Sequence, residues 1–482
     1  MKKYFLYASA LFAIALVIGI VMQQPSLYKP CALATAISLA IGLGSVPSLK
    51  GYQYTAWIIS AVVAGMLFPN ALDKWGVIDL RDKNLKLVII QLVMFGMGTH
   101  MSLSDFSGLR TTGKGVFIGL FCHFTIMPLM GLLLTKVFHF EPAIAAGIIL
   151  IGSCSSGLAS NVMVYLAKAN LPLSVIVTAM ATLVAPILTP FLMQKLAGQL
   201  VPVSFVDMMI EIIKIVLVPI GAALLHDYLK RASVKKKNIV YTLAAISVLW
   251  IAFVIYWVSD KTNFPQVAMT NTEIENVTGI EFIIQTLVQI ITSIKTITLS
   301  AFLAGAIIAG VVYNFLYNKF PKVDKMMPLV SMFGIIYFTA ITTATGRENL
   351  MKVGFLLFIA SVIHNAAGYF FGYWLSHLFG MDKNSSRTIA FEVGLQNGGM
   401  ATGIASRMDM LGTLGLAATV FSPWMNISGS ILANYWRRKP VSENDNNKSN
   451  VYNNSSSSDN NSNSQSTQNS TQSSNSAGQQ TH

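Results

Sequence analysis

Long apolar runs recur along the chain and are separated by short polar stretches. Each run is about 20 residues long, the length that an α-helix needs to cross the hydrocarbon core of a bilayer. We expect about fourteen such segments, with boundaries defined only to within several residues. They are 4–22, 31–48, 54–70, 85–101, 114–136, 142–167, 172–198, 205–227, 239–258, 297–317, 326–343, 353–380, 386–407 and 413–436. The pattern predicts an all-α polytopic membrane protein.

The composition supports this interpretation. Of the 482 residues, 53% are hydrophobic and 11% are charged, whereas a soluble domain carries about 25% charged residues. The apolar run after Met1 is longer than the core of a typical signal peptide, so we expect it to be retained within an extra N-terminal transmembrane region over 1–50. The stretch 440–482 is rich in Ser, Asn and Gln and almost free of apolar residues, which predicts a disordered tail.

The formal net charge of +13 is explained by the loops between the apolar segments. If the N-terminus is cytoplasmic and the segments alternate, most loop lysines and arginines fall on the cytoplasmic side, as the positive-inside rule requires. The loop at 72–86 is an exception, because its basic residues fall on the other side. The charges therefore predict a multi-pass protein of the cell membrane with both termini in the cytoplasm, and no nucleic-acid partner.

Two polar, glycine-containing stretches interrupt the apolar pattern. The stretch 391–400 holds a carboxylate (Glu392), two amides (Gln396 and Asn397) and three glycines. A carboxylate in hydrocarbon is costly unless something cationic or polar meets it, and glycines loosen a helix so that backbone carbonyls are left to bind an ion. The stretch 152–161 has the same character. Paired interruptions predict a transporter binding site, although glycine-rich packing faces between membrane helices produce a similar pattern.

Several motifs occur in the order that they have in a known family. They are Met94–Gly98 followed by Leu103–Phe106, Gly157–Asn161 followed by Tyr165–Ala167, Leu173–Thr178 followed by Leu188–Pro190, His364–Asn365 followed by Gly368–Tyr369, Glu392–Asn397, and Asn426–Ser430 followed by Tyr435–Trp436. On these motifs, which cover most of 54–436, the chain resembles the bile acid:sodium symporter family, with N-terminal and central insertions.

The resemblance implies a ten-helix core of two inverted five-helix repeats, in which the fourth and ninth helices are broken and cross near the middle of the membrane. We therefore expect the first part of the transporter core over 51–230 and the second part over 321–439. The residues between them, 231–320, are expected to be an insertion with two transmembrane helices. With the region 1–50, the insertion adds about four helices to the core.

The resemblance also implies two sodium sites that share one carboxylate. The first is expected to consist of Ser160, Asn161, Ser174, Thr178 and Glu392. The second is expected to use the side chains of Glu392 and Gln396 with backbone carbonyls near Val393 and Leu395. Hydroxyl, amide, carbonyl and carboxylate oxygens are the ligands that a hard cation requires. Asn397 is expected to contact the substrate, beside half-helix N-termini that favour an anionic group.

The chain departs from the family pattern at two positions. His123 stands where the family has a glutamine ligand of the second sodium site. A neutral imidazole nitrogen is a poor sodium ligand and an imidazolium repels the ion. Two interpretations stay open: a second site that is lost or proton-sensitive, and a histidine hydrogen-bonded in the core. Leu158 stands where the family has a threonine in contact with substrate, so the substrate cannot be copied from relatives.

Together these features predict a secondary active transporter that couples sodium to the symport of an organic anion, either bile-acid-like or a small carboxylate, with no cofactor besides the coupling ion. The alternatives are a proton-coupled or single-sodium organic acid transporter, and a membrane sensor that binds its ligand without moving it. An enzyme is not expected, because the sequence has no HExxH, GxSxG or phosphate-binding glycine loop.

Overall fold

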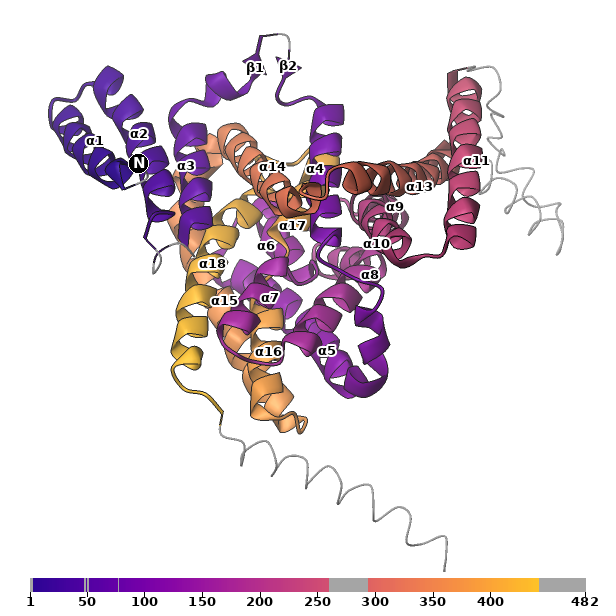
Figure 1. Cartoon of the computed structure of the whole chain (residues 1–482). Helices are drawn as coiled ribbons and strands as arrows, with labels where there is room; N and C mark the ends of the chain where they lie inside the picture. The colour runs from indigo at the N-terminus through magenta and orange to yellow at the C-terminus, as the bar shows by residue number, and fades with distance from the viewer. Residues whose placement is uncertain (1–2, 47–48, 50–51, 77, 260–293, 442–482) are drawn as a thin grey trace, which may run out of the picture.

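The computed structural model describes residues 3–46, 49, 52–76, 78–259 and 294–441, and these form a bundle of helices with one short β-hairpin (Figure 1). Almost all of the predicted tail over 440–482 lies outside the described residues, as does 260–293 in the predicted insertion.

The elements follow the chain in a simple order. The α-helices are α1 (Tyr4–Val21), α2 (Pro25–Leu43), α3 (Gln53–Leu67), α4 (Lys83–Gly98), α5 (Leu109–Phe138), α6 (Pro142–Ser153), α7 (Leu158–Leu166), α8 (Leu171–Leu196), α9 (Phe205–Ile212), α10 (Val218–Arg231), α11 (Val234–Ser259), α13 (Ile294–Lys319), α14 (Val323–Thr345), α15 (Arg347–Leu378), α16 (Lys383–Gly394), α17 (Gly398–Arg407) and α18 (Leu416–Arg437). A π-helical turn, η4 (Ile213–Leu217), joins α9 to α10. The hairpin of β1 (Lys74–Trp75) and β2 (Ile78–Asp79) lies between α3 and α4.

The apolar character predicted from the sequence is present in the helices. Among the described residues, nine helical segments are long and apolar enough to cross a membrane, and α3 and α6 are shorter apolar helices. Each predicted segment coincides with a helix or with a pair of helices. The chain is therefore a multi-pass membrane protein of the all-α class, apart from the two-residue strands of the hairpin.

The predicted start of the second segment needs correction. α2 begins at Pro25 rather than at 31, because proline is favoured at the first helical positions, where no intrahelical N–H bond is needed. The segments 142–167 and 386–407 are each divided, as expected from their polar interruptions: the first into α6 and α7, and the second into α16 and α17.

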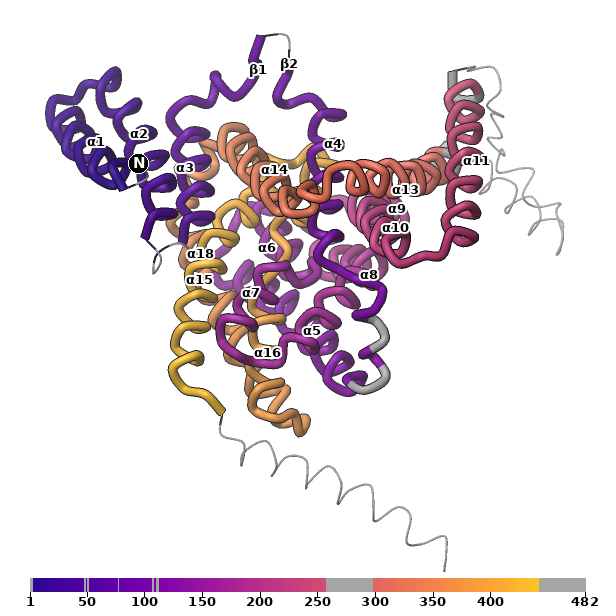
Figure 2. Tube along the Cα trace, in the orientation of Figure 1, coloured from indigo at the N-terminus to yellow at the C-terminus, as the bar shows by residue number. Residues whose placement is uncertain are grey.

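The helices of the regions that we expect to be additions lie at the edges of the bundle (Figure 1, Figure 2). At one edge, α1 packs on α2 and α2 packs on α3. At the opposite edge, α11 packs on α13 and α13 packs on α10. The divided helices α6–α7 and α16–α17 lie between these edges, in contact with α5, α8 and α18. The two polar interruptions are thus enclosed by other helices instead of facing lipid.

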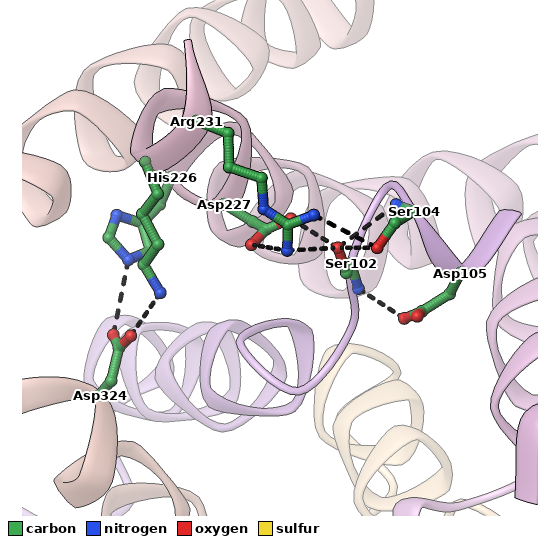
Figure 3. A network of polar contacts seen from close by, with 8 residues as sticks. Ser102, Ser104, Asp105, His226, Asp227, Arg231 and Asp324 are labelled. Carbon is green, nitrogen blue, oxygen red and sulfur yellow. Dashed lines mark hydrogen bonds and ion pairs between the residues drawn. The ribbon is translucent and has the colours of Figure 1, made fainter. Parts of the chain in front are cut away.

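A polar network joins α10, α13 and α14, and Figure 3 shows its contacts from α10 to Asp324 and to the connection between α4 and α5. Asp324 of α14 accepts hydrogen bonds from Lys230 of α10 at 2.5 Å and from the Tyr313 hydroxyl of α13 at 2.8 Å. Nε2 of His226 lies 3.5 Å from the same carboxylate. A neighbouring group ties α10 to the connection between α4 and α5 and consists of Ser102, Ser104, Asp227 and Arg231. The network attaches α13, which belongs to the predicted insertion, to helices of the predicted core.

Candidate cation and substrate site

The two interruptions lie against each other and exchange backbone hydrogen bonds. Ser156 and Gln396 form an isolated antiparallel bridge. The N–H of Gly157 donates to the Leu395 carbonyl at 3.0 Å, and the N–H of Asn397 donates to the Ser155 carbonyl at 2.8 Å. A broken helix exposes backbone groups that have no water to bind in a membrane. Here the backbone groups at each break bond to backbone groups of the other break. The predicted breaks in these two segments are therefore confirmed, and the two breaks lie together at one place in the bundle.

Glycine is required at this crossing because the chains approach so closely. A Cβ on Gly157 would stand 2.9 Å from the carbonyl oxygen of Gln396. A Cβ on Gly394 would stand 2.3 Å from the ring of Tyr369 on α15. Both distances are too short for a real contact, which explains why glycines occupy these positions in the sequence.

The carboxylate of Glu392 is fully buried at this crossing and is surrounded by hydroxyl groups. Its Oε1 accepts a hydrogen bond from Ser174 at 2.5 Å, and its Oε2 accepts one from Thr178 at 2.8 Å. Oδ1 of Asn161 lies 2.7 Å from the Ser174 hydroxyl and 3.3 Å from the Thr178 hydroxyl. The Ser160 hydroxyl is 3.4 Å from that of Thr178. Helices α7, α8 and α16 thus bring together all five residues expected at the first sodium site.

The oxygens of this cluster outnumber the protons that they share. The Ser174 hydroxyl lies within hydrogen-bond distance of both the carboxylate and the Asn161 oxygen, and the Thr178 hydroxyl does too, yet each hydroxyl carries one proton. In the described part of the chain no cationic side chain forms an ion pair with Glu392. A buried carboxylate needs a compensating positive charge or a proton. The atoms that could bind a cation here are all oxygens, which suits a hard cation.

Residues expected at the second sodium site already bond to one another and to the backbone of the first break. The Gln396 amide donates to the Val393 carbonyl at 2.6 Å, while its Oε1 is buried without a hydrogen-bond partner in the described chain. The Leu395 carbonyl is already bonded to the backbone of Gly157. One unused amide oxygen therefore remains for a ligand there.

His123 of α5 is fully buried beside that position. Its Nδ1 is 2.9 Å from the carbonyl oxygen of Glu392, and its Nε2 is 2.7 Å from the carbonyl oxygen of Cys154. The histidine therefore joins α5 to both breaks. It is hydrogen-bonded in the core, as one of the two interpretations expected.

A cavity of about 350 Å³ opens beside the crossing and contains both residues expected to contact substrate. Leu158 and Asn397 line it, together with residues of α3, α4, α14 and α18. Oδ1 of Asn397 accepts the Met400 N–H at 2.9 Å and so caps α17, whereas its Nδ2 is buried with no partner among the described residues. The lining is mostly apolar and includes no aspartate, glutamate, lysine or arginine. Tyr54, Thr55, His100 and Asn426 supply polar groups.

Sequence reasoning missed part of the support of this site. The Ser156 hydroxyl lies 3.1 Å from that of Ser160 and 3.4 Å from the Leu395 carbonyl, which links the two breaks. The Asn365 amide of α15 donates to the Gly394 carbonyl at 2.7 Å and so satisfies the end of α16. The polar residues that neighbour each other in the sequence at 153–156 and 364–365 were the available signals, but neither shows which carbonyl is bound.

Comparison with known proteins agrees with this geometry. A family model described as the sodium bile acid symporter family matches residues 87–263. The chain is 29% identical over 405 residues to the uncharacterized sodium-dependent transporter YocS of Bacillus subtilis, a match that covers 84% of this chain and 97% of that protein. The chain is thus similar to the sodium bile acid symporter family. The resemblance carried by the motifs is thereby confirmed.

Two further proteins are similar to the chain over different lengths. The probable sodium/metabolite cotransporter BASS1 of Arabidopsis thaliana chloroplasts is 24% identical over 386 residues, which cover 80% of this chain and 73% of that protein. The human ileal sodium/bile acid cotransporter is 37% identical over 98 residues, or 20% of this chain and 28% of that protein. The sodium bile acid symporter family consists of transporters, so the expectation that the chain is not an enzyme is confirmed.

Proposed function

We propose that this protein is a secondary active transporter that uses the sodium gradient to carry an organic anion across the plasma membrane. The observation that carries the proposal is Glu392, a fully buried carboxylate in a cage of oxygens at the crossing of two broken helices, with no ion-pair partner in the described residues. Binding sites of secondary transporters are built at such interruptions. The similar proteins, which are named as a sodium-dependent transporter and sodium cotransporters, support the same function.

Sodium is the cation that we assign to this cage. Ser160, Asn161, Ser174, Thr178 and Glu392 are its first set of ligands. Placing a monovalent cation there neutralises the carboxylate and gives the surplus oxygens a shared partner. A second sodium binds to the side chains of Glu392 and Gln396 with the carbonyls of Val393 and Leu395; Oε1 of Gln396 has no hydrogen-bond partner among the described residues.

The organic anion binds in the neighbouring cavity. The unpaired Nδ2 of Asn397 and the first turns of α7 and α17 supply hydrogen-bond donors and positive helix ends for an acidic group. The apolar remainder of the wall, with Leu158, accommodates a hydrocarbon body. A volume of about 350 Å³ lies at the lower end of the usual range for small-molecule sites. The substrate is thus a bile-acid-like compound or a smaller carboxylate.

Coupling between sodium and substrate follows because the cation cage and the substrate cavity lie next to each other. Glu392 lies on α16, and this helix leads directly into residues 395–397, which line the substrate cavity. Sodium bound at Glu392 therefore fixes the crossing that presents Asn397 to substrate. We propose that the crossing belongs to a ten-helix core of two inverted repeats, with both chain termini in the cytoplasm. In that arrangement, movement of α3, α4 and α14 against the crossing opens the cavity alternately to the two sides.

The test is uptake of a labelled bile acid and a labelled small keto acid into proteoliposomes that contain the purified protein. An inward sodium gradient should drive accumulation above the equilibrium level, and replacing sodium by potassium should abolish it. If a proton gradient drives uptake while a sodium gradient adds nothing at any pH, sodium coupling is wrong. Binding of a ligand in detergent without accumulation in vesicles would instead favour a sensor.

A second candidate, coupling to one sodium ion or to protons, is favoured by the contacts of His123. Both ring nitrogens face carbonyl oxygens, at 2.9 and 2.7 Å. A neutral imidazole donates from one nitrogen, and only an imidazolium donates from both. A protonated His123 would supply, beside Glu392, the positive charge that a second sodium otherwise provides. In this case uptake depends on sodium with a Hill coefficient of one and rises as the external pH falls.

A further inference from the structure

A long groove on the surface of α15 and α18 plays no part in the proposed transport site. Its volume is about 900 Å³. Residues of α15 and α18 form its walls, and residues from the beginning of α16 also line it. The lining is chiefly aromatic and includes Tyr369, Phe370, Tyr373, Trp374, Trp424 and Trp436. Such a surface fits a hydrocarbon ligand.

Arg387 of α16 lines this groove and forms no ion pair with the described residues. The residue is only 5% exposed, and its Nε is buried with no hydrogen-bond partner among the described residues. The guanidinium lies 5.5 Å from the ring centre of Trp436. None of the residues that line the groove is an aspartate or glutamate. A buried guanidinium nitrogen without an acceptor is unfavourable. An anion bound at the Arg387 end of the groove would supply that acceptor.

The same end of the groove has the character of a membrane interface. Lys383 and Lys439 line it together with Arg387, and Nζ of Lys439 lies 4.7 Å from the ring centre of Tyr435. Tyr and Trp side chains gather at the level of lipid headgroups, where Lys and Arg are also found. The aromatic residues next to these cations therefore place the basic end at headgroup level.

The length of the groove matches one leaflet of a bilayer. From Trp424 to Trp436 along α18 the distance is about 18 Å, at 1.5 Å per helical residue. Half of the hydrocarbon core of a bilayer is about 15 Å thick. We propose that the groove binds an anionic phospholipid, whose phosphate lies on Arg387 and Lys439 and whose acyl chain lies along the aromatic wall.

A lipid bound in the groove would hold in place α16, the helix that carries Glu392. Arg387 and Glu392 both belong to α16. At the inner edge of the groove, Asn365 donates to the Gly394 carbonyl at the end of α16 and accepts a hydrogen bond from Ser428. A bound lipid thus contacts α16 at its beginning and the support of its end, and it holds this helix against α15 and α18.

Native mass spectrometry of the full chain tests the proposal in the absence of sodium and substrate, so the outcome does not depend on transport. The protein is offered equal amounts of phosphatidylglycerol and phosphatidylcholine with identical acyl chains. We expect the anionic lipid to be retained about 25-fold more, because each of the two basic residues at the phosphate contributes about fivefold. Arg387→Gln should reduce this ratio about fivefold, whereas Arg387→Lys and the control Lys236→Gln, at an exposed position of α11, should keep it. Equal retention by the wild type, or an unchanged ratio in Arg387→Gln, overturns the proposal.

A second variant keeps the test decisive if Arg387→Gln does not fold. Ala366 is exposed in the wall of the groove, and Ala366→Trp fills it without changing any charge. Retention of both lipids should fall in this variant, and unchanged retention contradicts the assigned position. Excess inorganic phosphate should leave the lipid in place. Displacement by phosphate means a site for soluble anions, and this also overturns the proposal.

Discussion

The hydroxyl of Thr178 offers a sharp test of the cation cage, because valine has almost the same shape and lacks only the oxygen. The hydroxyl lies 2.8 Å from a carboxylate oxygen of Glu392 and is buried. A hydrogen bond or ligand contact to a charged group contributes about 1.5–3 kcal/mol. At 1.4 kcal/mol per factor of ten, Thr178→Val should weaken sodium binding about 10- to 100-fold.

The assay is thermal unfolding of the purified protein while sodium replaces potassium at constant ionic strength. At one hundred times its dissociation constant, a ligand stabilises the folded state by about 2.7 kcal/mol, and a variant with about 30-fold weaker affinity keeps about 0.9 kcal/mol. The matched control is Thr182→Val, one turn further along α8, whose hydroxyl donates to the Thr178 carbonyl at 2.8 Å instead of to Glu392. Equal sodium titrations for the wild type and Thr178→Val, or an equal loss in the control, would refute the reasoning.

Three further variants test the rest of the account by thermal unfolding. Gly394→Ala should lower the free energy of unfolding by about 1–3 kcal/mol, because its Cβ would collide with a tyrosine ring of α15. The control Gly221→Ala should leave stability unchanged, because a Cβ there meets nothing within 4 Å. Equal effects of the two substitutions would contradict the close approach at Gly394. Asp324→Asn should lower the free energy of unfolding by about 1–3 kcal/mol, because it breaks the network that holds α13. The control Asp409→Asn, in an exposed ion pair with a lysine, should lower it by less than about 1 kcal/mol. A larger loss in the control than in Asp324→Asn would show that the network does not stabilise the fold. His123→Gln should strengthen sodium binding about tenfold if the histidine replaces an oxygen ligand, and unchanged binding would favour a purely structural histidine.

The breaks in the two helices could be predicted from the sequence because their cause is local. Glycines and polar side chains stand together in apolar runs at 152–161 and 391–400, and both stretches are divided in the structure. The carboxylate of Glu392 pointed to a cation for the same reason. Its partners Ser174 and Thr178 are ordinary helical residues of α8, however, and they could be named only through the family resemblance.

Other features depend on contacts between distant segments and leave no local signal. Hydropathy did not show that Gly157 and Leu395 share a hydrogen bond, or that both nitrogens of His123 meet carbonyl oxygens. The stacking of Arg387 on Trp436 joins α16 to α18 and was equally invisible. The first residue of α2 was missed because a hydropathy window gives little weight to the polar turn that begins at Pro25, although proline starts helices readily.

The central claim is that Glu392 binds the coupling sodium ion, and equilibrium binding of radioactive sodium-22 to the purified protein tests it without knowledge of the substrate. The account predicts saturable binding to the wild type, loss of that binding in Glu392→Gln, and full binding in Glu348→Gln, whose carboxyl group is exposed at the start of α15. Saturable binding that survives in Glu392→Gln at wild-type affinity would contradict the account.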